Sequence, residues 1–253
     1  NLHPTEGYLI CPALPDLAAG VHHYHSHDHA LERRAAPDSI TWGSELQGGV
    51  VLALSSVHWR EAWKYGLRAY RYCQHDCGHA IAAVAYAAAA LGWQARLLSH
   101  WGDEELAALL GLDRMADFAA AELEYPDVAL WVGSAAPPTE LSVQALSASL
   151  RFVGQPNRLS PSQVAWPGMD EVEHAARRPP EVVPPAFQTL DPSPLTAVDN
   201  PTAAATLIRQ RRSAVAFDGV TSMSAERWFG LLDALLPRPK VPPLDAWPWS
   251  RRV

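Results

Sequence analysis

The residues that could do chemistry are concentrated between Trp59 and Leu98. Lys64 and Tyr65 stand side by side there, among several other aromatic side chains. An ammonium and a phenol held in an aromatic pocket can donate a proton to a substrate heteroatom or remove one, and burial would lower the pKa of the lysine to a useful range. The alternative is an interfacial Lys-Tyr pair without a chemical role.

The same stretch carries the composition of a binding surface. Its first half carries basic side chains among aromatic ones, including Arg60, Lys64 and Arg68 and the rings of Trp59, Trp63, Tyr65, Tyr70 and Tyr72. Cations pair with phosphate and aromatic rings stack on flat molecules, so the pattern indicates an anionic, planar ligand. A core helix with an ordinary rim of aromatic and basic side chains would have the same composition.

A second basic group lies far along the chain. Arg211, Arg212 and Ser213 follow an expected helix over residues 202–210 and begin a loop that leads into an expected strand. Guanidinium groups pair with phosphate through two parallel hydrogen bonds, and a serine adds a further donor. An exposed basic turn is the alternative to a phosphate site.

Metal-ligating residue types occur in two places, and we expect no metal site at either. Residues 22–29 hold five histidines and an aspartate, but successive residues of a hairpin face opposite sides, which favours a solvent-facing polar hairpin. Cys73 and Cys77 share a helix face that His75 does not, so they are expected to be small buried core residues.

Composition limits the class of protein. The 253 residues are 48% apolar, which allows a substantial core, and the net charge of −7 without a long basic run argues against nucleic acid as a partner. Three cysteines form no disulfide framework, which indicates a reducing compartment and a cytoplasmic location. The apolar run at residues 78–91 is shorter than the roughly 20 residues that cross a bilayer, so we expect no membrane span.

Local patterns predict an α+β fold. Strands are expected at residues 7–13 and 126–133, a hairpin near 21–33, and a central strand at 48–57. Helices are expected at residues 61–72 and 76–91, with breaks near Gly66 and Cys73. A third helix is expected to begin at Asp103 and end at Gly111, a fourth to cover residues 140–152, and another to begin after Ser224, which caps it. The helix at residues 76–91 is apolar on all sides, so we expect it to be buried at the centre of the fold. We expect the fold itself to be a mostly antiparallel sheet flanked by helices.

Four stretches together resemble the nitroreductase superfamily, specifically its SagB-type, azoline-oxidising dehydrogenase branch. They are NLHPTEGYLI, AWKYGLRAYRYCQHDCGHAIAAVAYAAAALGW, NRLSPSQVAWPGMDEVEHA and RRSAVAFDGVTSMSAERWFGLLDALLP. They cover about half the chain, and the second, which resembles the core helices of that family, is the most specific.

The order of the four stretches implies a slice of a tandem-domain protein with incomplete copies of the domain. The Arg-Arg-Ser loop that normally opens a nitroreductase domain comes last here. The resemblance therefore divides the chain into the latter part of a first domain (residues 1–138), a Pro-rich connector with one helix (139–201) and the opening of a second domain (202–253).

The resemblance implies a function and a set of site residues. The family binds FMN at a dimer interface, so a homodimer or a pseudo-dimer within one chain is expected. Lys64 and Tyr65 match the pair that removes a proton during azoline oxidation, while hydride passes to the flavin N5. The flavin contacts implied are Asn1, Ser99, His100, Arg211, Arg212 and Ser213, although Val215 stands where the family often has a basic residue.

Three functions from different classes follow. The first is an FMN-dependent oxidoreductase acting on a peptide azoline or a small conjugated substrate. The second is a catalytically silent nitroreductase-like partner that scaffolds a peptide-modifying complex. Two features favour this second function: the first domain has no Arg-Arg-Ser loop in this sequence, and Val215 replaces a basic residue in the second. A histidine-rich metal-binding protein is a third alternative.

Overall fold

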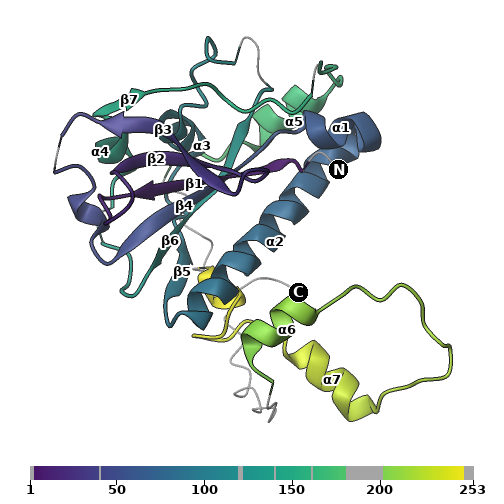
Figure 1. Cartoon of the computed structure of the whole chain (residues 1–253). Coiled ribbons are helices and arrows are strands. Elements are labelled where there is room, and N and C mark those ends of the chain that lie inside the picture. Colours follow the sequence, from purple (N-terminus) through teal and green to yellow (C-terminus); the bar gives the residue numbers. More distant parts are fainter. Residues whose placement is uncertain are drawn as a thin grey trace.

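The computed structural model describes residues 3–39, 41–118, 122–139, 141–160, 162–180 and 202–247. Its centre is a seven-stranded antiparallel sheet with the strand order β5-β6-β4-β1-β2-β3-β7 (Figure 1). The strands are β1 Thr5–Cys11, β2 Gly20–His25, β3 Ala30–Pro37, β4 Gly49–Ser56, β5 Gln94–Leu97, β6 Tyr125–Gly133 and β7 Leu150–Phe152.

The interior strands β4 and β6 are covered on both faces, which explains their nearly continuous apolar sequences. Val51 and Ala53 belong to one core cluster, whereas Leu54 belongs to the other. The neighbouring β6 divides in the same way, with Trp131 on the first face and Leu130 on the second. Side chains alternate between the faces of a strand, so each of these strands contributes to two cores.

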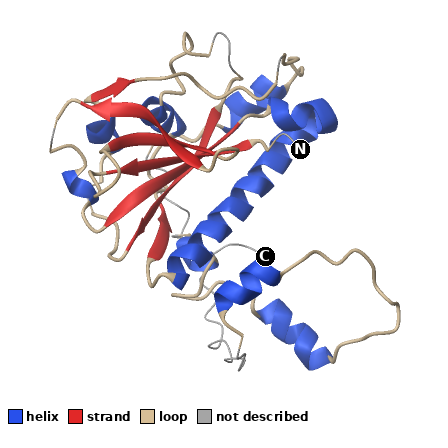
Figure 2. Cartoon of the chain, in the orientation of Figure 1, coloured by secondary structure: helices blue, strands red, loops and turns tan. Residues whose placement is uncertain are grey.

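Helices form a layer on each side of the sheet (Figure 2). The helices α3 and α4 pack on one face together with Trp42 and Trp101, and α2 packs on the other. The helices of this body are α1 Trp59–Tyr65, α2 Ala69–Ala90, α3 Asp103–Leu110, α4 Val143–Ser147 and α5 Met169–Ala176. The 3-10 turns are η1 Ser44–Leu46, η2 Gly66–Arg68 and η3 Leu244–Ala246. The architecture is the predicted α+β one.

The helix α2 differs from its prediction in two ways. It is continuous across Cys73, since nothing there removes a backbone hydrogen bond, and the break falls only at Gly66. Burial on all sides is also wrong for the described chain, because a single stripe at intervals of three or four residues faces the sheet. The buried residues of this stripe are Ala69, Cys73, Cys77, Ile81, Ala85 and Ala88.

Two further predictions are wrong in part. Of the helix expected at residues 140–152, only α4 forms, and its last residues instead form the edge strand β7, which pairs with β3. Glu140 lies outside the described residues. The strand expected after Arg212 is absent from the described part of the chain, where residues 211–218 carry no regular structure.

The chain then forms an arm, residues 202–235, with the helices α6 Ala204–Gln210 and α7 Ala225–Asp233 (Figure 1). Ser224 caps α7 as predicted, because its hydroxyl accepts a hydrogen bond from the backbone N–H of Arg227 at 3.2 Å. No residue of α6 or α7 is buried. Beyond the arm, Ala246 and Trp247 join the core beneath α2 and β5.

Within the described residues, the chain contains no helix with the length and apolar character needed to cross a membrane.

Candidate functional site

Lys64 and Tyr65 occupy the last turn of α1, just before the chain bends at Gly66. The Lys64 Nζ lies 5.0 Å from the centroid of the Tyr65 ring, and that ring packs at 4.7 Å between centroids against Tyr72 on α2. Lys64 is exposed and Tyr65 is half-buried. The pair is therefore formed as the sequence suggests, but on the surface of this chain rather than inside a pocket.

The prediction that burial lowers the pKa of Lys64 is wrong for the described chain. Contact with the Tyr65 phenol raises the pKa of Lys64 above its ordinary value. An exposed ammonium stays protonated at neutral pH because water and the phenol both stabilise its charge. In this state Lys64 can donate a proton but cannot accept one.

Ser99 and His100 lie in the loop between β5 and α3. Ser99 is half-buried, while His100 is exposed and its Nε2 lies 3.4 Å from the Leu141 carbonyl oxygen. The His100 ring meets the buried Trp101 edge-on, with 6.1 Å between centroids. This loop could present backbone groups to a ligand, as the resemblance implies.

Arg211, Arg212 and Ser213 lie directly after α6 in the arm, and all three are exposed. The Arg212 Nη1 donates to the carbonyl oxygens of Arg209 and Arg211, both at 2.8 Å. Asn1, the remaining predicted flavin contact, lies outside the described residues. The donor set has the chemistry that a phosphate requires, since each guanidinium offers several N–H groups.

These predicted residues do not form one site in the described part of the chain. Among the residues described, no hydrogen bond, ion pair or ring contact links the Lys64–Tyr65 pair with His100 or with the Arg211–Ser213 loop. The phosphate donors fit FMN by their chemistry, but nothing described here encloses its ring system. A complete flavin site would need groups from a second unit.

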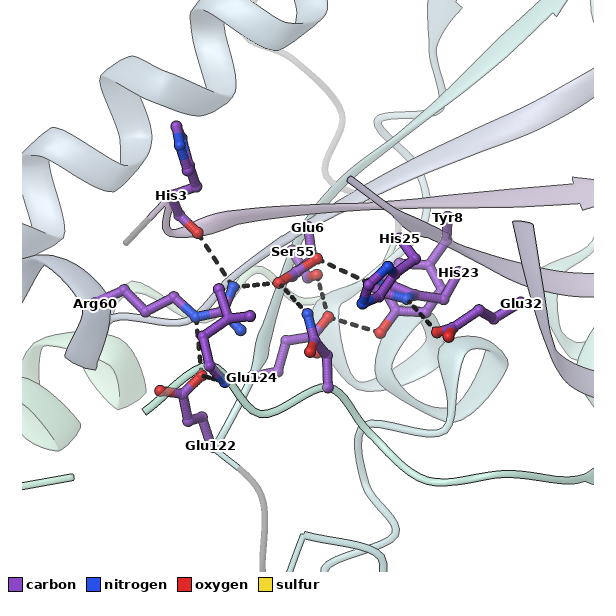
Figure 3. Close-up of polar contacts among 12 residues, drawn as sticks. His3, Glu6, Tyr8, His23, His25, Glu32, Ser55, Arg60, Glu122 and Glu124 are labelled. Carbon is purple, nitrogen blue, oxygen red and sulfur yellow. Dashed lines mark hydrogen bonds and ion pairs between the residues drawn. The ribbon is translucent and has the colours of Figure 1, made fainter. Parts of the chain in front are cut away.

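Arg60, which the sequence suggested as a ligand contact, is instead buried in a network of ion pairs (Figure 3). Its Nε donates to Glu122 Oε2 at 2.9 Å, and its Nη1 pairs with Glu6 Oε1 and donates to the His3 carbonyl oxygen at 3.1 Å. Glu6 also accepts from His23 Nε2 at 2.8 Å. The prediction that Arg60 contacts a ligand is therefore wrong, because tertiary contacts with two carboxylates neutralise its charge inside the protein.

The network holds its members in defined charge states. Burial opposes ionisation of Glu6, yet the hydrogen bond from His23 and the charge of Arg60 lower its pKa. Burial likewise opposes the charge on His23, and the contacts with Glu6 raise its pKa. A neighbouring carboxyl, Glu124, has a pKa raised by burial and accepts hydrogen bonds from Tyr8 at 2.7 Å and from Ser55. All of these groups are buried, so the network lies inside the protein rather than at a surface open to a ligand.

A second buried group surrounds His58, the residue before α1. Its ring stacks on Tyr125 with 4.8 Å between centroids and an interplanar angle of 12°. Burial lowers the pKa of His58 to about 4, so this imidazole is neutral at physiological pH. Its Nε2 lies 3.9 Å from Glu173 Oε2, and burial together with the nearby Asp103 and Asp127 raises the pKa of Glu173 to about 7.

An open pocket of about 280 Å³ lies where α1, the start of β6 and residues 163–170 meet. It is lined by His58, Trp59, Ala62, Leu123, Tyr125, Gln163, Val164, Ala165, Trp166, Met169 and Asp170. Lys64 is not in the lining. Successive helical residues are about 100° apart, so Lys64 lies roughly opposite Ala62 on α1.

Sequence reasoning missed this pocket because its far wall belongs to the connector. A signal was present in the segment Trp166-Pro167-Gly168, which ends the extended chain and starts α5 with an acidic first turn. The contact of that segment with α1, more than 90 residues earlier, is tertiary and leaves no local trace.

The histidine hairpin is more buried than predicted. His22 and His23 are buried at the base of β2, where His22 Nε2 bonds the Ala18 carbonyl oxygen at 2.9 Å, whereas His27 and His29 are exposed. Among the described side chains, no group of three or more His, Cys, Asp or Glu is placed to hold a metal ion. Cys73 and Cys77 are buried, as predicted.

Comparisons with known proteins give similarity at the level of fold. No family model matches the chain, and no curated protein matches it. A crystal structure of a protein assigned as a nitroreductase from Anabaena variabilis is similar over 56% of this chain and 29% of that chain, with a TM-score of 0.44 and 24% identity. The E. coli microcin synthetase McbBCD complex with truncated pro-MccB17 bound is similar over 53% of each chain, with a TM-score of 0.44 and 19% identity.

The chain thus spans less than two thirds of either solved structure. Likeness at these values concerns fold alone and carries no argument about activity.

Proposed function

We propose that this chain is part of an FMN-dependent oxidoreductase of the nitroreductase type, in the SagB-type dehydrogenase branch. We further propose that its flavin site lies at an interface with a second nitroreductase-like unit. The observation that supports both points is the surface position of Lys64, His100 and Arg211. Each has suitable chemistry for a flavin site, but none is enclosed by the described chain.

The exposed side of α2 supports the proposed interface. Beyond its buried stripe the helix presents Ala83, Tyr86 and Ala87 to solvent, and Tyr86 is 49% exposed. Small side chains let another helix approach closely, and covering this face would remove apolar surface from water. The Lys64–Tyr65 pair stands near the amino end of the same helix, so a unit docked there would also cover the pair.

In the proposed reaction each group has a separate role. FMN, when bound, supplies the hydride transfer, and the protein must orient it and exclude water. Lys64 would become a base only when the second unit covers it, because desolvation lowers a lysine pKa. Tyr65 would stay beside it as a hydrogen-bonding partner. The substrate class we propose is an azoline in a peptide, or a small conjugated molecule.

A catalytically silent partner is the second candidate, and one observation favours it. In the described chain Lys64 is exposed, its pKa is raised, and it faces away from the pocket beside α1. A domain that only scaffolds a peptide-modifying complex would not need those groups to converge. The proposed division at residues 138 and 201 applies to either candidate.

The bound cofactor distinguishes the two candidates. We expect the purified chain, titrated with FMN, to develop a perturbed flavin spectrum, to release FMN on denaturation as identified by mass spectrometry, and to sediment as a dimer when loaded. A colourless protein that leaves the FMN spectrum unchanged at every protein concentration would contradict the enzyme and support the silent partner.

A further inference from the structure

The pocket between α1 and the connector has the composition of a cation-binding site. Two indoles, Trp59 and Trp166, and the phenol of Tyr125 contribute aromatic walls, and the carboxylate of Asp170 stands at one side. The faces of aromatic rings carry negative potential, so they attract an organic cation when it lies within about 6 Å of the ring centre. Among the residues that the structure describes, no lysine or arginine lines the pocket.

Charges around the pocket also disfavour an anion. The imidazole of His58 contributes no positive charge, because burial lowers its pKa to about 4. Behind it stands Glu173, and the two arginines that follow α5 are paired with carboxylates: Arg178 Nη2 lies 2.9 Å from Asp103 Oδ1, and Arg177 Nη1 lies 4.0 Å from Glu104 Oε1. A phosphate or carboxylate would therefore meet the Asp170 carboxylate without a compensating positive charge from the described lining residues.

Local contacts hold the walls in position. The Tyr125 hydroxyl donates to Asp170 Oδ1 at 3.3 Å, and the Trp59 indole N–H donates to Ser160 Oγ at 3.4 Å. Trp166 lies against the backbone of Gly66, where an added Cβ would stand 3.0 Å from its ring. Trp166 remains 41% exposed, so the indole is accessible to a ligand from solvent.

We propose that this pocket binds a compact organic cation, either a protonated or a quaternary amine, through the rings of Trp59 and Trp166 and the carboxylate of Asp170. Its volume of about 280 Å³ is just below the roughly 300 Å³ at which the range for small-molecule sites begins, which limits the occupant to a small head group. The proposal does not depend on flavin chemistry, since Lys64 lies on the opposite side of α1.

The test uses choline and its uncharged isostere 3,3-dimethyl-1-butanol, which differ in charge but hardly in shape. Binding is followed by tryptophan fluorescence and by calorimetry at constant ionic strength. We expect choline to bind at least about 10-fold more tightly than the alcohol, which is the discrimination that a partly desolvated cation–π contact provides. Equal affinity for the two, or no choline binding up to tens of millimolar, would overturn the proposal.

Matched variants locate the site. Asp170→Asn should weaken choline binding about 3- to 10-fold, whereas Glu171→Gln, which removes the same charge one residue along α5 and outside the lining, should leave it unchanged. Trp166→Leu should weaken it about 3- to 30-fold, and Trp63→Leu, at another half-exposed tryptophan outside the lining, should not. If the two carboxylate variants, or the two tryptophan variants, weakened choline binding equally, that result would also contradict the proposed site.

Discussion

At the scale of single residues, side chains of the same or similar type have different roles according to what surrounds them. Arg60 and Lys64 are one helical turn apart, yet Arg60 is buried between Glu6 and Glu122 whereas Lys64 is exposed. His22 and His23 are adjacent and both buried, but burial lowers the pKa of His22, whereas Glu6 overcomes burial and raises that of His23. Two tests follow from these contrasts.

The adjacent histidines should respond to pH in opposite directions. The stability that His23 gains from Glu6 is fully present below its ordinary pKa of 6.5 and is lost as pH rises through its raised folded value. His23→Gln should therefore lower the free energy of unfolding by about 1.5–3 kcal/mol near pH 6, and by less near pH 9.

His22 supplies the control. Its lowered pKa means that wild-type protein loses stability as pH falls through 6.5, when the unfolded chain takes up a proton that the folded chain resists. The cost of His22→Gln should therefore shrink toward acid pH. Urea unfolding of both variants at several pH values measures this, and parallel pH profiles would show that the two environments do not differ as described.

Lys64 is the residue on which the proposed catalysis depends. If it acts as the base, Lys64→Ala should retain bound FMN and lower turnover by about 100- to 10,000-fold, which is the usual contribution of a positioned acid or base. Lys240→Ala, at another exposed lysine, should have normal turnover. Loss of flavin from the Lys64 variant would indicate a binding role instead, and normal turnover would exclude Lys64 as the base.

At the scale of elements, the junction between α1 and α2 determines which groups meet. Gly66 has a φ of 60°, a conformation that L side chains rarely adopt, and it allows the close approach of Trp166. This bend directs α2 along the sheet while α1 forms one wall of the pocket. Gly78, within α2, has a helical conformation and nothing within 4 Å of an added Cβ.

The two glycines should therefore give opposite results when replaced by alanine. Gly66→Ala should destabilise the protein by about 1–3 kcal/mol because its backbone conformation becomes strained, and it should shift the fluorescence of Trp166. Gly78→Ala should stabilise it by about 0.5–1 kcal/mol through helix propensity. Thermal unfolding followed by circular dichroism measures both changes; a stable Gly66→Ala protein would show that the junction tolerates a side chain.

At the scale of the whole molecule, the arm exposes apolar surface that packing within the described chain does not cover. Its large apolar side chains include Phe217, Trp228 and Phe229, which are 88%, 51% and 66% exposed. Apolar surface of this extent is unfavourable in water and is typical of a region that packs against another unit. The resemblance assigns this region to the opening of a second nitroreductase-like domain, which remains a proposal.

The arm also carries the proposed phosphate loop. If Arg211 and Arg212 hold the flavin phosphate, replacing both with alanine should weaken FMN binding about 10- to 100-fold and leave riboflavin binding nearly unchanged, since riboflavin lacks the phosphate. Arg209 and Arg227, replaced together, give a control with the same charge change. Equal weakening of FMN and riboflavin would contradict the assignment.

Local sequence patterns were sufficient for much of the fold. Alternation and β-branched runs located β1, the β2–β3 hairpin, β4 and β6, while Ser224 and Gly111 correctly marked a helix start and a helix stop. These features depend on residues close together in the chain, so a single window of sequence contains their cause.

The sequence by itself determined the kinds of side chain available and most of the strands and helices that carry them. Tertiary structure decided which of those side chains face solvent, a partner charge or a pocket. Arg60 meets carboxylates 54 and 62 residues away, and the connector closes on α1 to form a pocket that neither segment contains alone. Charge neutralisation and burial are set by such distant contacts, because electrostatic and apolar interactions depend on separation in space rather than along the chain.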